Sequence, residues 1–219
     1  MDLQLFRQTC TPCLCSLTQL STAGDCDGCG RRVAGCGPVA MAQIQEFYHP
    51  DLSRPRFTNG KCNATTAGES NLGTLMKDMG SKANSSYNYM GSCNTFTWPN
   101  NVKSGLTGYG FSSGGSGIEA YQYTQIKSEL NGNHPLIFWG STCLDCWSNY
   151  HVWVCDGYQE NNYSDFNCAT KQCNEWSYSF LHMNWGWGDE WNDYYAFGQY
   201  NPDGDHYNGN LHVISGIRP

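Results

Sequence analysis

Apolar and polar positions in the first part of the chain repeat with the spacing of an α-helix. From Pro38 to Tyr48 the apolar side chains recur every three or four residues and fall on one face. This pattern predicts a largely buried helix over residues 37–48. Pro38 suits its first turn, and Pro50 supplies its stop. Cys36 lies at the N-terminal end of this predicted helix.

Three weaker patterns predict further helices. One begins after Ser70, carries apolar residues at helical spacing, and stops at Gly80. Another covers residues 123–130 and is closed by Asn131 and Gly132. A short helix is predicted at residues 101–107.

From Pro135 onward the period changes to two, which is typical of β-strands. Strands are predicted at residues 136–139, 151–155, 177–184, 194–197 and 211–217. Because the helices come first and the strands afterwards, the sequence predicts an α+β fold. In such a fold the helices pack on an antiparallel sheet, unlike a βαβ array.

The chain of 219 residues has the length of one well-cored domain. We therefore expect a single domain over residues 1–219. It divides into an irregular, cysteine-rich segment (1–35), a mainly helical part (36–132) and a mainly antiparallel sheet part (133–219).

Charge and hydropathy exclude several classes of protein. The net charge is −7, and the only cluster of basic residues is Arg31-Arg32, so a nucleic-acid backbone would be repelled. No apolar stretch approaches the about 18 residues of a membrane span. The opening Met1-Asp2 lacks the basic and apolar regions of a signal peptide.

The 13 cysteines are dense for a reducing cytosol and predict an oxidising compartment. Six disulfides would leave one free thiol. Cys26-x-x-Cys29 and Cys143-x-x-Cys146 could alternatively supply four thiolates to a zinc ion. In a secreted protein disulfides are the favoured interpretation.

Cys36 is the candidate for the free thiol. Unsatisfied N–H groups and the dipole at a helix N-terminus favour the thiolate, which is the reactive form. A thiolate nucleophile also needs a base and a group that orients the base. His151 begins an apolar strand, and Asn184 with Trp185 ends a later one. Asn184 would accept a hydrogen bond from one ring nitrogen of His151, and Trp185 would shield that bond from water.

Four sequence blocks, at residues 35–44, 151–158, 184–188 and 213–219, together resemble the streptopain family of bacterial papain-like cysteine endopeptidases. The resemblance extends over about residues 35–219. It implies a papain-like fold in which a helical part with the nucleophile faces a sheet part with the base across a cleft. It also implies a secreted or cell-envelope location.

By this resemblance Cys36 is the nucleophile, His151 is the general base and then the acid, Asn184 orients His151, and Trp185 is the shield. The implied reaction is hydrolysis of peptide bonds in proteins or peptides through an acyl-enzyme. No metal or organic cofactor is implied. An apolar residue would be preferred one position upstream of the residue that donates the cleaved carbonyl.

The resemblance also implies an oxyanion hole formed by the Cys36 N–H and an upstream glutamine. Gln8 is the preferred candidate and Gln19 is its rival. Only 35 residues precede Cys36, so the chain is interpreted as the mature form. An inhibitory pro-segment is expected in the precursor.

Other polar residues near these motifs have less specific roles. His182 is interpreted as a structural strand residue. Asp189 and Glu190 would favour basic groups on the substrate if they line the cleft. The glycine- and asparagine-rich loop at residues 198–210 is a candidate mobile flap.

Two alternatives stay open at this point. The same residues could catalyse another acyl transfer, such as that of a peptidoglycan amidase or a transglutaminase, since Cys-His-Asn geometry does not choose the acyl acceptor. Alternatively, Cys36 could be oxidised to a partner, which would leave a catalytically silent, disulfide-rich binding module.

Overall fold

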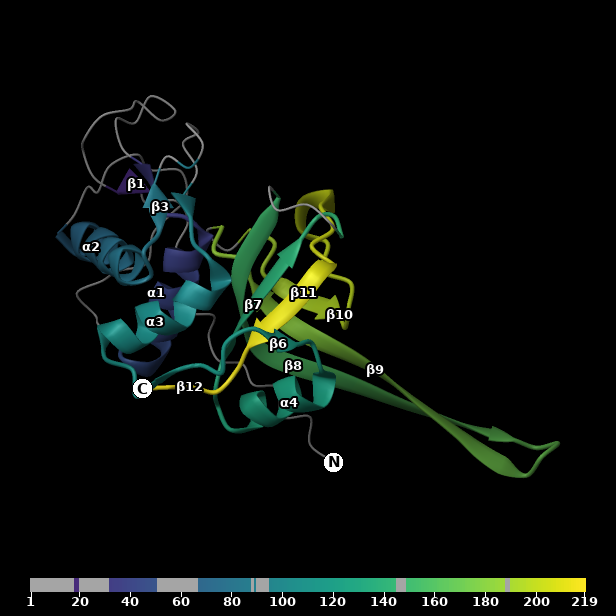
Figure 1. Ribbon diagram of the computed structural model, residues 1–219. Helices are drawn as coiled ribbons and strands as arrows, with labels where there is room; N and C mark the ends of the chain where they lie inside the picture. The colour runs from purple at the N-terminus through teal and green to yellow at the C-terminus, as the bar shows by residue number, and fades with distance from the viewer. Residues whose placement is uncertain are drawn as a thin grey trace.

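The structure is a computed structural model that describes residues 18–19, 32–50, 67–87, 89, 95–144, 149–187 and 190–219. Its α-helices confirm the four predicted ones (Figure 1): α1 (Cys36–Tyr48), α2 (Ala67–Lys82), α3 (Pro99–Tyr109) and α4 (Tyr123–Asn131). None of the helices in these described ranges is long and apolar enough to cross a membrane.

Helix α2 continues past Gly80, where the sequence predicted its end. Gly80 instead lies where α2 packs closely against Pro38 and Tyr87. A Cβ atom there would stand 3.2 Å from Pro38 Cγ in α1 and would clash with the Tyr87 hydroxyl. The missing side chain therefore serves helix packing rather than helix termination.

The main sheet has six strands in the order β10-β9-β8-β7-β11-β6, and every neighbouring pair is antiparallel. This arrangement confirms the predicted α+β class. The strands are β6 (Glu119–Ala120), β7 (Leu136–Ser141), β8 (Tyr150–Asn167), β9 (Gln172–Asn184), β10 (Asp193–Ala196) and β11 (Gly209–Ile214).

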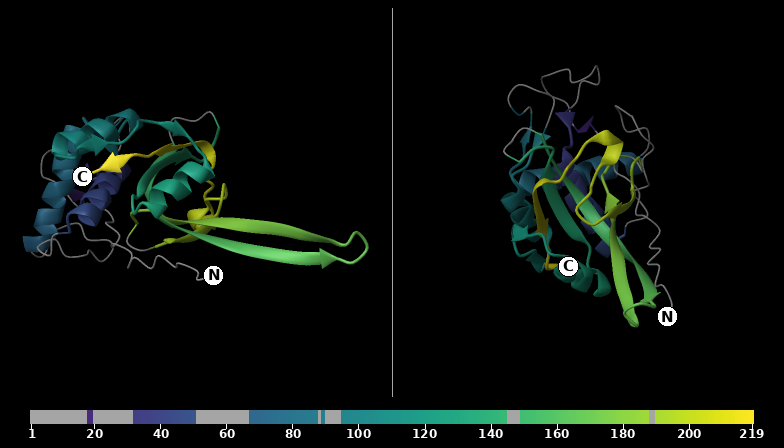
Figure 2. Two further views of the ribbon diagram at one scale, coloured as in Figure 1. Left: turned by 90° about the horizontal axis from the view of Figure 1, so that it is seen from below. Right: turned by 90° about the vertical axis from the view of Figure 1, so that its right-hand side faces the viewer.

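Two strand predictions differ from the structure. Strands β8 and β9 run far beyond the predicted segments and form a hairpin that projects from the rest of the protein (Figures 1 and 2). Residues 162–178 of this hairpin are exposed on both faces, so no apolar alternation marks them. The predicted strand at 211–217 is interrupted after Ile214, and β12 (Ile217–Arg218) pairs instead with β5 (Ser113–Gly114).

Two apolar clusters cover the two faces of the sheet. One joins helices α1, α2 and α3 to side chains such as Ile137, Val152 and Val154. The other joins α4 to the opposite side chains, among them Phe138 and Trp153. Alternate residues of β7 and β8 thus serve different clusters.

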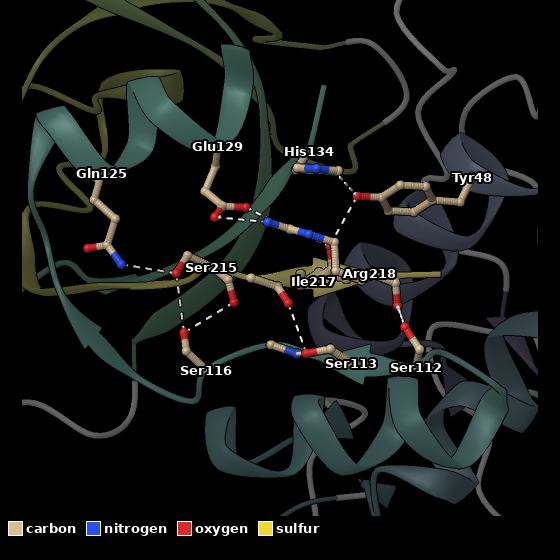
Figure 3. A network of polar contacts seen from close by, with 12 residues as sticks. Tyr48, Ser112, Ser113, Ser116, Gln125, Glu129, His134, Ser215, Ile217 and Arg218 are labelled. Atoms are coloured by element: carbon tan, nitrogen blue, oxygen red, sulfur yellow. Dashed lines mark hydrogen bonds and ion pairs between the residues drawn. The ribbon is translucent and has the colours of Figure 1, made fainter. Parts of the chain in front are cut away.

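Strand β12 ties the helical part to the sheet part (Figure 3). The Tyr48 hydroxyl at the end of α1 donates to Ile217 O at 3.1 Å. Arg218 forms a bidentate ion pair with Glu129 of α4, with a shortest N–O distance of 2.8 Å.

Two short antiparallel pairs complete the strands described. Strand β1 (Thr18–Gln19) pairs with β2 (Arg32–Val33), and β3 (Ser86–Tyr87) pairs with β4 (Thr95–Phe96).

Candidate active site

Cys36 is the first residue of α1, as the sequence predicts. The backbone N–H groups of Val152 and Gly37 lie close enough to its thiol to lower the pKa of that thiol. Burial nevertheless raises the pKa of Cys36, and these N–H groups offset the rise only in part. The N–H groups at the helix N-terminus thus favour the thiolate, as expected from the sequence, but desolvation outweighs their effect on the pKa.

The contact with Val152 brings the thiol to the strand that carries the candidate base. Val152 follows His151 directly on β8, and helix α1 packs on this strand. Two segments more than a hundred residues apart in the sequence thus meet at one place. The structure brings the predicted nucleophile beside the chain segment of the predicted base.

The imidazole of His151 is buried, with 9% of the residue exposed, and it has a definite tautomer. Its Nε2 lies 2.8 Å from the backbone oxygen of Trp185. A carbonyl oxygen can only accept, so Nε2 carries the proton and Nδ1 keeps its lone pair. Burial lowers the pKa of His151 to about 4, against an opposing effect of the Trp185 carbonyl. His151 is therefore neutral at pH 7 and can accept a proton at Nδ1.

Aromatic rings surround this imidazole. The nearest is Trp187, at 4.8 Å between ring centroids, followed by Tyr207 at 5.7 Å and Trp185 at 6.0 Å. The shielding expected of Trp185 is thus shared with its neighbours. Their apolar faces explain why the charged form of His151 is disfavoured.

Tyr207 is a residue of the site that sequence reasoning missed. Its ring contacts His151, and its pKa is raised to about 12 by burial, with smaller effects of the charges at Asp205 and Cys36. Tyr207 therefore lies near both predicted reacting residues. No local pattern could have found it, because it lies in an irregular polar loop.

That loop, residues 198–210, was predicted to be a mobile flap. In the structure its two sides are joined by hydrogen bonds: Tyr200 N–H donates to Asn208 Oδ1 at 2.7 Å, and Tyr207 N–H donates to Tyr200 O at 3.0 Å. The Tyr200 side chain is fully buried. These contacts argue against a freely moving flap.

Asn184 has different partners from the one expected. Its Oδ1 accepts from Gln43 Nε2 at 2.7 Å and from the Gly186 N–H at 3.2 Å. The group that orients the His151 ring is the Trp185 carbonyl. The sequence did not single out Gln43 as a partner of Asn184, although a glutamine on the buried face of the helix at 37–48 was a visible signal.

The other candidate residues lie apart from this group or outside the described residues. His182 pairs with Asp156 at 2.5 Å; burial alone would lower the pKa of His182, but the hydrogen bond and charge of Asp156 raise it. Such a partly buried pair fits the structural role expected of His182. Glu190 is exposed, and Asp189 lies outside the described residues.

The oxyanion and zinc candidates fall largely on residues that the structure does not describe. Gln8 is one of them. Gln19 is described only through its backbone, which pairs with Arg32. Of the cysteines in the zinc alternative, only Cys143 lies within the described residues.

Comparison with known proteins connects this geometry to a family. The profile of the Peptidase C10 family matches residues 56–195, well over half of the chain. The chain belongs to the Peptidase C10 family, which is the streptopain family. The matched range contains His151 and Asn184, and Cys36 precedes it.

A solved structure agrees with this membership. The Prevotella intermedia interpain A cysteine protease resembles the chain with a TM-score of 0.59 and 20% sequence identity, over 92% of this chain and 88% of that one. This similarity confirms the papain-like α+β fold. No curated protein matches the chain.

The chain is therefore a cysteine endopeptidase. Family membership favours peptide-bond hydrolysis over the other acyl transfers and over a silent binding module.

Proposed function

We propose that Cys36 and His151 carry out the peptidase reaction of this protein. The observation that supports this most is the place of the Cys36 thiol, which lies beside the backbone N–H of Val152, the residue that follows His151. The tautomer of His151 adds to it, since the unprotonated Nδ1 is the atom a general base requires.

The reaction begins from a neutral thiol and a neutral imidazole, because burial disfavours both charged forms. Cys36 transfers its proton to His151 Nδ1 as its sulfur attacks the substrate carbonyl. The imidazolium then protonates the leaving amine, and the acyl-enzyme forms. Neutral His151 next activates water, which releases the second product and the free thiol.

The oxyanion of the tetrahedral intermediate needs donors that are already in place. We assign this role to the Cys36 N–H and to Gln8, with Gln19 as the rival. Loss of the correct glutamine should lower kcat by about 100-fold or more. Comparison of Gln8→Ala with Gln19→Ala decides between them, and a near-normal kcat in both variants would exclude both.

Variants of the reacting pair test the mechanism. Cys36→Ala and His151→Ala should abolish cleavage of an unfolded protein substrate while the circular dichroism spectrum stays that of the wild type. Cys168→Ala is the matched control, because Cys168 is an exposed free thiol on the hairpin of β8 and β9. Full activity of either variant of the pair would refute the mechanism.

The charge state of the resting pair has its own test. Iodoacetamide should alkylate Cys36 of the free enzyme at a rate that rises continuously from pH 5 to pH 9, because only the minor thiolate reacts. A rate that is already constant between pH 5 and pH 8 would indicate a preformed thiolate–imidazolium pair instead.

We further propose that the chain acts as one peptidase unit over residues 1–219, secreted or held at the bacterial cell envelope and made as a precursor with an inhibitory pro-segment. The substrates are proteins or peptides. The disulfide bond of Cys143 supports an oxidising compartment, as does the number of cysteines. Mass spectrometry of the non-reduced, secreted protein should find Cys36 as a free thiol.

A further inference from the structure

One peptide group connects the candidate base to helix α1. The carbonyl of Trp185 accepts from His151 Nε2 at 2.8 Å, and the N–H of Gly186 donates to Asn184 Oδ1 at 3.2 Å. The Trp185 carbonyl and the Gly186 N–H belong to the same planar peptide unit. A rotation of that plane would therefore lengthen both hydrogen bonds together.

Asn184 holds this peptide plane through a hydrogen bond to the Gly186 N–H, and Gln43 in turn holds the Asn184 side chain. Its Oδ1 has two lone pairs. One accepts from Gly186 N–H, and the other accepts from Gln43 Nε2 at 2.7 Å. Both side chains are buried, with 3% of Gln43 and 2% of Asn184 exposed, so water does not readily replace either bond.

The glycine of this turn is also packed on α1. Gly186 has a φ of +75°, and a Cβ atom there would lie 2.7 Å from Val39 Cγ1 and 3.7 Å from Gln43 Nε2. On the other side, the N–H of Trp185 donates to Asn192 Oδ1 at 2.9 Å. The turn is thus held between α1 and the segment after β9.

We propose that Gln43 is a positioning residue of the peptidase: through Asn184 it holds the Trp185–Gly186 peptide against His151 and so keeps the imidazole in the tautomer with Nδ1 free. This inference rests on the proposed function of His151. Because Gln43 lies on the helix that begins with Cys36, the same contact couples the nucleophile helix to the base.

Core filling alone does not explain a glutamine at this position. Gln43 Oε1 is buried and has no hydrogen-bond partner among the described residues, which is unfavourable. A leucine or methionine would fill the space without that cost. What the amide adds is a donor aimed at Asn184, since rotating the amide by half a turn would bring two oxygen atoms together.

Kinetics of Gln43→Met test the proposal. The substitution keeps the volume of the side chain and removes the donor. We expect kcat to fall by about ten-fold or more with KM nearly unchanged, because Gln43 acts on the base and not on the substrate. Gln45→Met is the matched control, since Gln45 is a buried glutamine of the same helix outside this group, and its kcat should stay within about two-fold of the wild type.

A second variant gives a pH signature that a purely structural role would not produce. In Gln43→Glu the protonated carboxylic acid can still donate to Asn184, whereas the ionised form would repel its Oδ1. Burial raises the pKa of the introduced acid. The kcat of this variant, divided by that of the wild type at the same pH, should therefore be higher at pH 5 than at pH 8.

The possible outcomes separate this inference from the proposed function. A wild type without Cys36-dependent peptidase activity refutes the proposed function itself. An active wild type together with a folded Gln43→Met variant of normal kcat refutes only the role of Gln43. If Gln43→Met does not fold, a ratio for Gln43→Glu that is equal at pH 5 and pH 8 refutes it instead. Nitrogen-15 spectra of labelled histidine should show His151 protonated at Nε2 in the wild type and a mixture of tautomers in Gln43→Met.

Discussion

Burial decides the charge of both residues that we assign to the reaction. It raises the pKa of Cys36 and lowers the pKa of His151 to about 4. Each shift favours the neutral form. The enzyme then depends on correct placement of His151 Nδ1, which explains the importance of the hydrogen bond to the Trp185 carbonyl.

The shift at His151 predicts a loss of stability in acid. Between the ordinary histidine pKa of 6.5 and about 4, the unfolded chain binds a proton that the folded chain does not. Stability is therefore fully present above about pH 6.5 and decreases as the pH falls, by about 3 kcal/mol at pH 4.

Urea unfolding of the wild type and of His151→Gln between pH 7 and pH 4 measures this effect. Carboxylates contribute equally to both proteins, so the difference between the two curves isolates His151. The free energy of unfolding of the variant should depend less steeply on pH. Parallel curves for the two proteins would contradict the assignment of a buried, neutral His151.

The tight packing of the turn after β9 predicts that adding one methyl group at Gly186 lowers the stability of the protein. Gly186→Ala should destabilise the protein by about 2–4 kcal/mol, because it adds both the strain of a positive φ and a clash with Val39. Gly198→Ala is the matched control: Gly198 has a φ of +81°, but apart from its two chain neighbours no atom of a described residue lies within 4 Å of the added Cβ. It should cost only the strain, about 1–2 kcal/mol.

Chemical denaturation of the two glycine variants gives the cost of the clash by difference. The double variant Val39→Ala with Gly186→Ala should recover part of the loss, since Val39→Ala removes the methyl group that the new Cβ would meet. Equal destabilisation by Gly186→Ala and Gly198→Ala would show that the turn is not packed tightly against α1.

The projecting hairpin of β8 and β9 predicts a tolerated deletion. Residues 162–178 are exposed, and their aromatic rings contact one another: Tyr163 and Trp176 stack at 6.1 Å, and Tyr163 meets Tyr178 edge-on at 5.7 Å. Asn161 pairs with Tyr178, so a two-residue Asn-Gly turn can replace residues 162–177. The melting temperature should change by only a few degrees, because few contacts with the rest of the protein are lost.

Thermal unfolding and peptidase assays of the deletion variant check this expectation. Unchanged peptidase activity would place the hairpin outside the catalytic unit. A drop of more than about 10 °C would show instead that the hairpin supports the main sheet.

The C-terminal strand predicts how the helical and sheet parts are coupled. Tyr48→Phe removes the hydroxyl that donates to Ile217 O and that also lies 3.1 Å from His134 Nδ1 (Figure 3). It should reduce the free energy of unfolding by about 1 kcal/mol, since both part-buried hydrogen bonds of this hydroxyl are lost while Ile217 O still accepts from Arg218 Nη1 at 2.8 Å.

Tyr109→Phe is the control for this measurement. The Tyr109 hydroxyl makes no hydrogen bond with any described residue, so its loss should change the free energy of unfolding by less than about 0.5 kcal/mol. Equal effects of the two substitutions in urea unfolding would argue against coupling through Ile217.

Local periodicity was sufficient for much of the architecture. The helical spacing and prolines of residues 37–48 predicted α1 to within one residue, and Asn131 with Gly132 marked the end of α4. The change of period after Pro135 predicted the order of helices before strands. The motifs around His151 and Asn184 predicted the family. Each of these features depends on neighbours along the chain, so the sequence contains it directly.

The tertiary structure decided the contacts around the proposed site. Gln43 and Asn184 are 141 residues apart, and neither periodicity nor motif could pair them. The same holds for Tyr207 beside His151 and for the choice of the Trp185 carbonyl over the Asn184 amide. The charge of Cys36 depended on how much water the packed helix and sheet exclude. Desolvation and hydrogen-bond geometry are properties of segments brought together by folding, which is why the sequence alone offered candidate residues for the site but not their partners or protonation.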